Sequence, residues 1–308
     1  MKFSVRLGSL LLSLITASVF AGPASEPSLT PVDSPIEEET GPPFPFELDA
    51  EYTHIGEAAV DGHGTRINLD ENYSLLRFVY TPRINLGILR LGAAYERFGF
   101  GLPDNAPLEP ALQSVVAIVG LDTQFSDSIL VRLEAQPGFY GGNDHIDRSD
   151  FNVPFLLGGT YIYSPNLQFV LGMSVDFERE YPVIPGGGIR WRIGPQWVLN
   201  AVAPTPRLEF ELNKELTFYA GGNIKGSTFR VEDDFGTRVG QPRLNGAVLS
   251  YMEVRTGVGL EIKVAPGIKL SLEGGYLPYR NFDYHRAGVR YEHEEGGGYG
   301  TIAFHAAF

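Results

Sequence analysis

The sequence predicts an all-β protein, a closed antiparallel up-and-down β-barrel that spans a membrane with about 14 strands. From Phe46 onward, apolar and polar residues alternate almost without interruption, which is the period of strands with one apolar and one polar face. The connections between these stretches are short and long in turn, as in membrane-spanning barrels. After residue 21 no apolar run reaches the roughly 18 residues of a spanning helix, so a membrane crossing would have to be a barrel.

The first 21 residues have the features of a secretory signal peptide. Lys2 and Arg6 give a positive start, residues 7–20 are apolar or small, and SVFAGPA provides a small-residue cleavage site. This segment predicts export and a mature chain that begins near Gly22. The chain has no cysteine, which excludes disulfides, thiol catalysis and thiolate metal sites.

Residues 22–45 are rich in proline and acidic residues and poor in apolar ones. We expect a flexible lead rather than a domain, because such a segment cannot bury enough apolar surface to fold. Whether it enters the barrel stays open. Removal of residues 1–21 changes the formal net charge from −13 to −15, because two basic residues and no acidic ones are lost. An acidic chain of this kind is not expected to bind nucleic acid.

Residues 46–308 are expected to form the barrel. In residues 46–52, the sequence FELDAEY places four apolar or aromatic residues on one face and three acidic ones on the other. A soluble β-sandwich would also alternate. Here, however, the apolar faces are about as tall as the apolar band of a bilayer, and the opposite face is crowded with charge and glycine. The same alternation recurs in residues 89–96, 129–139, 167–177 and 252–262.

The connections predict the number of strands and the position of the chain ends. Short turns are expected around Pro82 and at 126–128, 164–166, 194–196, 213–215 and 265–267. Longer loops are expected at roughly 58–72, 99–111, 140–151, 178–183, 231–246 and 279–297. Six short turns give 14 strands with both chain ends on the short-turn side, provided that residues 204–206 are a tight turn. If they are only a bulge, 12 strands remain.

Aromatic residues gather near both ends of the predicted strands. Two such belts are expected of a spanning barrel, at its two interfaces with water. The belt on the short-turn side contains Tyr80, Phe125, Tyr163, Trp197, Phe218 and Phe308, and the belt on the loop side contains Tyr52, Tyr95, Phe139, Phe177 and Tyr276.

The sequence ends in GTIAFHAAF, whose period of two continues to Phe308. Ile302, Phe304, Ala306 and Phe308 resemble the C-terminal signature of bacterial outer-membrane β-barrel proteins, which the barrel-assembly machinery recognises. Residues 181–210 also resemble the central part of a porin-like barrel family known only as a domain of unknown function. These resemblances imply a bacterial outer membrane, contact with its lipid and lipopolysaccharide, and periplasmic chain ends. They imply no activity.

Charged residues of both signs occupy the polar faces of the predicted strands. Two interpretations stay open: a water-filled pore with acidic and basic walls, or an interior closed by ion pairs. Arg190 and Arg192 form the densest basic pair and could attract anions. The residues expected to line the lumen are Arg77, Arg90, Glu96, Arg132, Glu134, Arg190, Arg192, Arg207, Glu209, Glu211, Glu253, Arg255 and Glu261.

Catalytic and metal motifs are weak in this sequence. We find no G-x-S-x-G or H-E-x-x-H motif, and no cofactor is expected. The stretch NDHIDRSD contains oxygen-rich candidates for a divalent cation, namely Asp144, His145, Asp147 and Asp150, but lacks the frame of a calcium loop. Solvated acidic loops explain it better.

These features predict a channel or porin-like barrel for small polar solutes. The second hypothesis is a non-conducting structural or surface-interaction barrel that acts through acidic loops, and the third is an outer-membrane hydrolase. Fold does not decide between them. The substrate and the oligomeric state are not predicted.

Overall fold

The computed structural model describes residues 45–142 and 147–308, which form one sheet of 18 strands. Fourteen of them close into an antiparallel barrel, because β1 pairs with β2 along one edge and with β18 along the other. The other four are short: β3 pairs with β4, β7 with β5, β8 with β7, and β17 with β16. The predicted fold class and the count of 14 are therefore confirmed.

The strand bounds are β1 Phe46–Gly62, β2 Thr65–Tyr80, β3 Arg83–Ile84, β4 Gly87–Gly101, β5 Ala111–Ser126, β6 Ile129–Ala135, β7 Gly138–Gly142, β8 Phe151–Asn152, β9 Phe155–Ser164, β10 Leu167–Val175, β11 Val183–Arg192, β12 Trp197–Val202, β13 Arg207–Glu211, β14 Leu216–Arg230, β15 Val248–Ala265, β16 Ile268–Tyr284, β17 Val289–Glu295 and β18 Gly298–Ala307. The helices are short: η1 Arg148–Asp150, α1 Phe235–Arg238, η2 Pro242–Leu244 and η3 His285–Ala287. No helix in the described ranges is long and apolar enough to cross a membrane.

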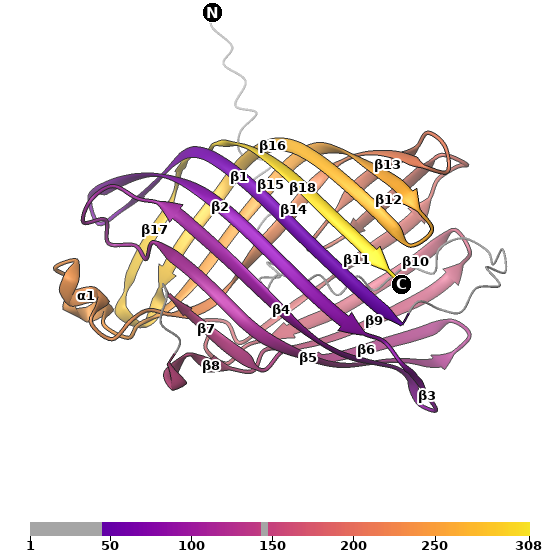
Figure 1. The fold of residues 1–308 in the computed structure, drawn as a ribbon, viewed down its shortest axis with the longest axis horizontal. Coiled ribbons are helices and arrows are strands. Elements are labelled where there is room, and N and C mark those ends of the chain that lie inside the picture. The colour runs from indigo at the N-terminus through magenta and orange to yellow at the C-terminus, as the bar shows by residue number, and fades with distance from the viewer. Residues whose placement is uncertain (1–44, 143–146) are drawn as a thin grey trace, which may run out of the picture.

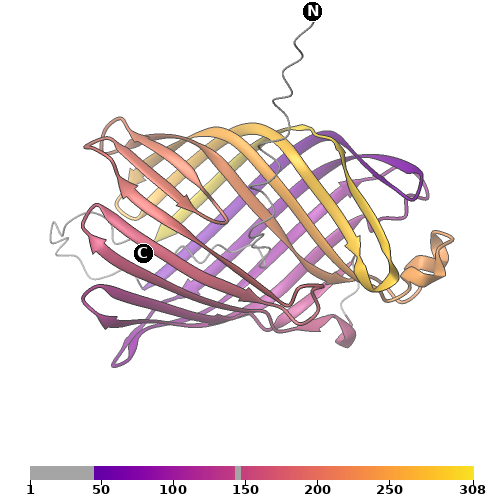
Figure 2. The same cartoon turned by 180° about the vertical axis from the view of Figure 1, so that it is seen from behind.

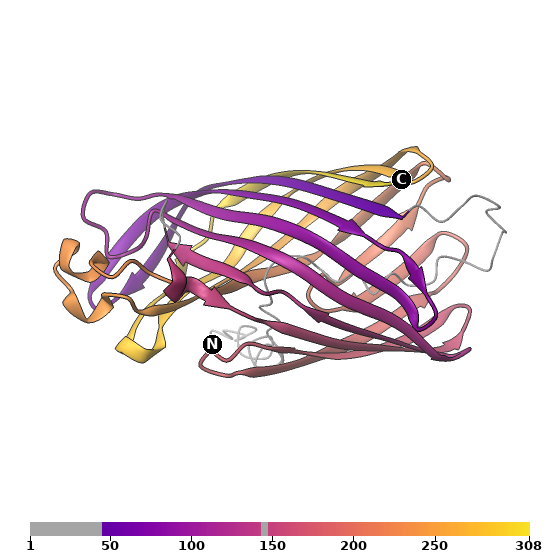
Figure 3. The ribbon, with the colours of Figure 1, turned by 60° about the horizontal axis from the view of Figure 1, so that its bottom comes forward.

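The two ends of the barrel differ. Phe46 and Phe308 lie together at the end that carries the short turns, which we call the turn side, and α1 lies at the opposite end, the loop side (Figures 1 and 3). Residues 203–206 form a real turn between β12 and β13. The alternative of 12 strands is wrong for this reason.

Two of the expected long loops are wrong. Residues 58–72 were expected to be a loop, but β1 and β2 continue to a two-residue turn at His63 and Gly64. Both residues have positive φ, 52° and 74°, which is what a tight hairpin turn requires. The predicted loop at 279–297 is likewise mostly strand, with only residues 285–288 between β16 and β17. The outer faces of these strand ends carry polar residues, so the sequence pattern there is that of a loop.

The outer wall is apolar toward the turn side and polar toward the loop side. Tyr52 on β1 and Tyr95 on β4 mark the boundary, and their hydroxyls donate to Asn72 and Gln113. A continuous exposed apolar band of this kind is what a lipid-facing wall needs. Its exposed members include Leu76, Phe78, Leu91, Val115, Val119, Leu133, Leu157, Tyr161, Phe169, Leu171, Trp191, Leu208, Phe218, Val258, Leu272, Ile302 and Phe304.

The loop-side half of the barrel is filled. Rings from different strands meet inside it: Phe98 lies 4.9 Å from both Tyr73 and Tyr251, and Phe100 lies 5.2 Å from Phe282. At this level β7 contacts β14 directly, with Gly141 opposite Arg230. The sheet therefore narrows beyond the ends of β8 to β13, and aromatic side chains pack the space that remains.

Candidate functional site

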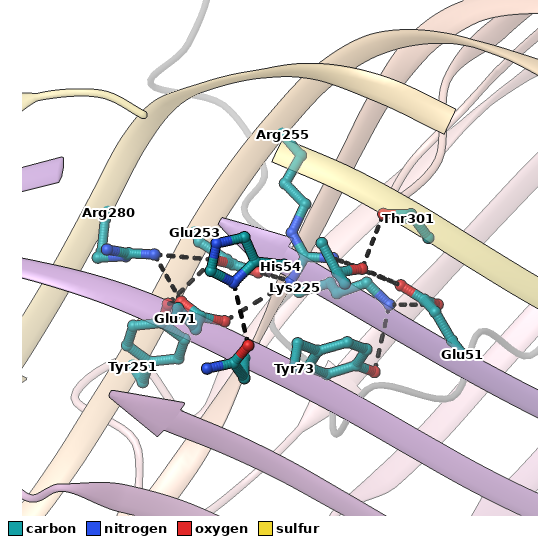
Figure 4. Close-up of polar contacts among 12 residues, drawn as sticks. Glu51, His54, Glu71, Tyr73, Lys225, Tyr251, Glu253, Arg255, Arg280 and Thr301 are labelled. Atoms are coloured by element: carbon teal, nitrogen blue, oxygen red, sulfur yellow. Dashed lines mark hydrogen bonds and ion pairs between the residues drawn. The ribbon is translucent and has the colours of Figure 1, made fainter. Parts of the chain in front are cut away.

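Six charged side chains meet near the middle of the barrel and form what we call the central ionic cluster (Figure 4). Lys225 Nζ lies 2.9 Å from Glu51 Oε2, and Arg280 Nη2 lies 2.6 Å from Glu71 Oε2. These contacts join β14 and β16 to β1 and β2, so they cross the interior instead of following one wall. The members are Glu51, Glu71, Lys225, Glu253, Arg255 and Arg280, three carboxylates and three cations.

Neighbouring polar and aromatic groups complete the cluster. The Tyr251 hydroxyl donates to Glu71 at 2.7 Å, and Lys225 donates to the Tyr73 hydroxyl at 3.2 Å. The cations of Lys225 and Arg255 also lie 4.3 and 4.9 Å from the centre of the Tyr73 ring. Such partners offset the high cost of taking charges out of water. The cluster is therefore a fixed, buried bridge across the lumen.

A second group of paired charges lies nearer the turn side. Arg90 reaches Glu47 at 2.9 Å and Glu134 at 3.5 Å, and Arg132 Nε lies 2.5 Å from Asp122 Oδ1. Arg77 lies 3.5 Å from Asp49, whose other oxygen lies 2.6 Å from His305 Nδ1. These side chains come from β1, β2, β4, β5, β6 and β18. They line one wall with ion pairs.

The opposite wall carries its own pairs. Arg192 and Glu211 form a two-pronged pair, with both N–O distances at 2.8 Å. Arg207 lies 2.7 Å from Glu209, and Lys269 lies 3.2 Å from Glu261. Arg190 lines the cavity described below, and Glu96 is buried on β4. Of the two interpretations of the interior charges, these contacts favour ion pairing.

A cavity of about 370 Å³ lies between the central ionic cluster and the wall formed by β9 to β14. Pockets of this size hold small organic ligands. Its charged lining consists of Glu51, Arg190, Arg207, Glu209, Lys225, Arg255 and Glu273.

Sequence reasoning missed Glu51, Glu71, Lys225 and Arg280 as interior charges. For Glu51 the alternation in residues 46–52 already indicated an inner position, because Glu51 lies on the acidic face of that stretch. Glu71 and Arg280 fell within expected loops, so their alternation was not used. Lys225 lies in a stretch rich in glycine, where the apolar half of the pattern is thin.

The C-terminal residues lie as an outward row on β18. Ile302, Phe304 and Phe308 are exposed, whereas Ala306 is covered by its neighbours Leu48 and Ile268. Phe46 and Phe308 exchange two backbone hydrogen bonds of 3.0 and 2.9 Å, and their rings stack at 5.7 Å. The last residue thus helps to close the barrel against the first strand.

The candidate cation ligands are only partly described. Asp144 and His145 lie outside the described residues, as do the predicted signal peptide and residues 22–44. Asp150 uses Oδ2 to accept a hydrogen bond of 2.9 Å from the Asp147 backbone N–H. Within 45–142 and 147–308, no three His, Asp or Glu residues are grouped so that they could hold a metal ion.

Comparisons with known proteins give structural likeness alone. No protein-family model and no curated protein matches the chain. Among solved structures, the COG4313 outer membrane channel from Pseudomonas putida F1 is similar at 8% identity and a TM-score of 0.48, over 89% of this chain and 99% of that one.

Two further solved structures are similar over most of the chain. The KdgM porin in complex with oligogalacturonate matches at 11% identity and a TM-score of 0.37, over 85% of this chain and 99% of that one. The toluene transporter TodX of Pseudomonas putida matches at 8% identity and a TM-score of 0.38, over 87% of this chain and 90% of that one. At these identities and scores the likeness carries no conclusion about function.

Proposed function

We propose that the protein is an outer-membrane channel for small polar solutes and that the conformation described here is closed. The observation that carries the proposal is a charged cavity inside a barrel whose outer wall is apolar. An apolar band suits the protein to a lipid bilayer, and a lumen with charges of both signs suits it to polar cargo. The signal peptide predicted at residues 1–21 and the C-terminal aromatic residue support placement in a bacterial outer membrane.

The central ionic cluster is the constriction in this proposal. It bridges the lumen at the point where the cavity ends, and the aromatic core lies beyond it on the loop side. Conduction requires both the central ionic cluster and the aromatic core to rearrange. We therefore expect the resting protein to conduct in brief, rare steps.

Single-channel recording in a planar bilayer tests this function. The mature protein is compared with Lys225→Ala/Arg255→Ala, which removes the two cations that reach Glu51. We expect discrete steps from the wild type and more frequent or larger steps from the variant. A matched control, Arg238→Ala/Arg286→Ala, removes two cations from loop-side segments and is expected to conduct like the wild type.

A non-conducting barrel is the second candidate, and the packed loop-side core favours it. In that case the ion pairs serve stability alone. Absence of steps from both the folded wild type and the double variant would support this candidate and contradict the channel.

A further inference from the structure

The cavity is lined by two neighbouring rows of side chains. Residues that lie directly opposite each other on paired strands share a face of the sheet, so the register shows which side chains form a row. Figure 2 shows β10 to β13, from pink to salmon, side by side on the near wall of the barrel. The first row runs across these four strands and presents guanidinium and amide groups to the cavity: Gln168, Arg190, Asn200 and Arg207.

The second row begins beside the first and carries the acids. It runs across β13 to β18 and consists of Glu209, Tyr219, Gly259, Glu273 and Thr301. All of them except Gly259 line the cavity. Arg207 and Glu209 are two positions apart on β13, so the rows meet there and continue around the wall in opposite directions. The cavity therefore has a basic side on β11 to β13 and an acidic side that reaches β16.

Two tyrosines of the acidic side lie over glycines of β15. A Cβ added at Gly259 would collide with the Tyr219 ring, and one added at Gly257 would collide with the Tyr299 hydroxyl. The two side chains thus occupy space that a larger residue on β15 would fill, which is a common use of glycine inside a sheet. Because the tyrosines lie against the wall, they frame the cavity without filling it.

Glu273 is held by hydroxyl groups instead of a cation. The Tyr299 hydroxyl donates to its Oε1 at 2.5 Å, and the Tyr219 hydroxyl lies near the same carboxylate. In the described part of the chain, no lysine, arginine or histidine forms an ion pair with Glu273; Arg207, which lies 5.1 Å from the centre of the Tyr219 ring, pairs with Glu209. A carboxylate with hydroxyl and aromatic neighbours suits the ammonium group of a ligand.

Arg190 and Arg207 make the basic side suitable for a carboxylate. They lie on either side of Asn200 in the first row. A guanidinium group presents its donors as a planar fork, which matches the two oxygens of a carboxylate. The amides of Gln168 and Asn200 can add hydrogen bonds from the same row.

The cavity lies on the accessible side of the central ionic cluster. The lumen-facing side chains of Arg207, Glu211 and Lys269, at and below the cavity toward the turn side, are 35%, 32% and 41% exposed. On the loop side, by contrast, Phe98 and Tyr251 are fully buried in the aromatic core. Among the described residues, a solute from the turn side therefore meets the cavity before the central ionic cluster.

We propose that the cavity binds short zwitterionic solutes of the amino-acid type, with the carboxylate on Arg190 and Arg207 and the ammonium on Glu273. Because the Tyr219 ring separates Arg207 from Glu273, the two charges of the ligand are several bonds apart, as in an ω-amino acid. The inference names the solute class of the channel proposed above and rests on that function for passage of the solute. Binding in the cavity needs no conducting state.

Equilibrium dialysis of radiolabelled 4-aminobutanoate against the mature protein in lipid nanodiscs tests this site. We expect saturable binding by the wild type. Unlabelled butanoate and butylamine have the same carbon chain with one of the two charges each. Both are expected to compete at least about tenfold more weakly than unlabelled 4-aminobutanoate, because each leaves one side of the cavity without its partner.

Two variants separate recognition of each charge from a structural role. Glu273→Gln is expected to lose the preference for 4-aminobutanoate over butanoate, and Arg190→Gln is expected to reduce the preference over butylamine. The control Glu261→Gln removes a carboxylate that pairs with Lys269 on the same side of the barrel but does not line the cavity, and it should keep both preferences. A general defect in folding would lower the amount of bound ligand without changing these ratios.

Three outcomes would overturn the proposal: no saturable binding by the folded wild type, competition by butanoate or butylamine as strong as that by 4-aminobutanoate, or an unchanged preference in either variant. The channel is tested by conductance, so the two failures are distinguishable. Conductance steps from a protein that does not bind 4-aminobutanoate would contradict the solute class and leave the channel. Binding by a protein without steps would contradict the channel and leave the site.

Discussion

Lys225 and Glu51, 174 positions apart in the sequence, meet inside the barrel with Nζ 2.9 Å from Oε2. One residue is on β14 and the other on β1, and four strand positions separate them around the wall. The contact therefore spans the lumen. Together with the Arg255–Glu51 and Arg280–Glu71 pairs, it makes the interior of this barrel a structured polar layer.

Arg280→Met is expected to destabilise the protein strongly. Arg280 is fully buried, and its loss leaves Glu71 without its nearest cation. Removal of one partner from a buried pair typically costs about 3–5 kcal/mol. Urea unfolding in lipid vesicles, followed by the fluorescence of the two tryptophans, measures the loss. The exposed control Arg66→Met is expected to change stability by less than about 1 kcal/mol.

Glu51→Gln is expected to shift the selectivity of any conductance toward anions. The change leaves Lys225 and Arg255 at the constriction without the carboxylate that both contact. The reversal potential under a salt gradient measures the shift. Glu295→Gln removes the same charge from an exposed position and should leave the reversal potential almost unchanged; equal shifts in both variants would place the selective region elsewhere.

The loop side is expected to loosen as the pH rises. Glu109, in the connection after β4, is 1% exposed, and burial raises the pKa of its carboxyl to about 7, although the Glu232 backbone N–H donates a hydrogen bond to it. Because the folded pKa exceeds the unfolded one, the stabilising contribution is complete below about pH 4.5. It is lost as the pH rises through 7, by up to about 3 kcal/mol.

Limited proteolysis of the loop-side connections at pH 5 and pH 8 measures this effect. We expect faster cleavage at pH 8 in the wild type. Glu109→Gln, which mimics the protonated acid, should be cleaved at similar rates at both values. The control Asp104→Asn, on the exposed part of the same connection, should keep the wild-type difference. A wild type without that difference contradicts the prediction.

Phe308→Ala is expected to reduce the amount of assembled barrel in cells more than the stability of the folded protein. The lost stacking on Phe46 is worth about 0.5–1.5 kcal/mol, whereas the resemblance to an assembly signature predicts a larger kinetic defect. Heat-modifiable mobility of outer-membrane fractions measures assembly. Phe78→Ala removes another ring that stacks on Phe46 and should assemble normally; equal defects would assign the effect to stacking.

The local alternation of apolar and polar residues was enough to predict the 14-stranded barrel. The alternation in residues 46–52 and its repeats predicted strands with an outer apolar face, and the tight turn at 204–206 predicted 14 strands; both predictions hold. The period of two is a property of the strand backbone, so it can be read without knowledge of the partner strand. The same pattern failed at residues 58–72 and 279–297, because strands that continue beyond the apolar band lose their apolar outer face.

The state of the lumen depended on contacts between distant strands. Alternation placed Glu253 and Arg255 on an inner face, but it could not say that Arg255 would reach Glu51 or that Glu71 would lie against Arg280. The narrowing of the sheet toward the loop side likewise follows from unequal strand lengths around the barrel, together with the direct contact of β7 with β14. Pairing partners and closure are set by packing across the whole cylinder, whereas the alternation within each strand is set by its own backbone.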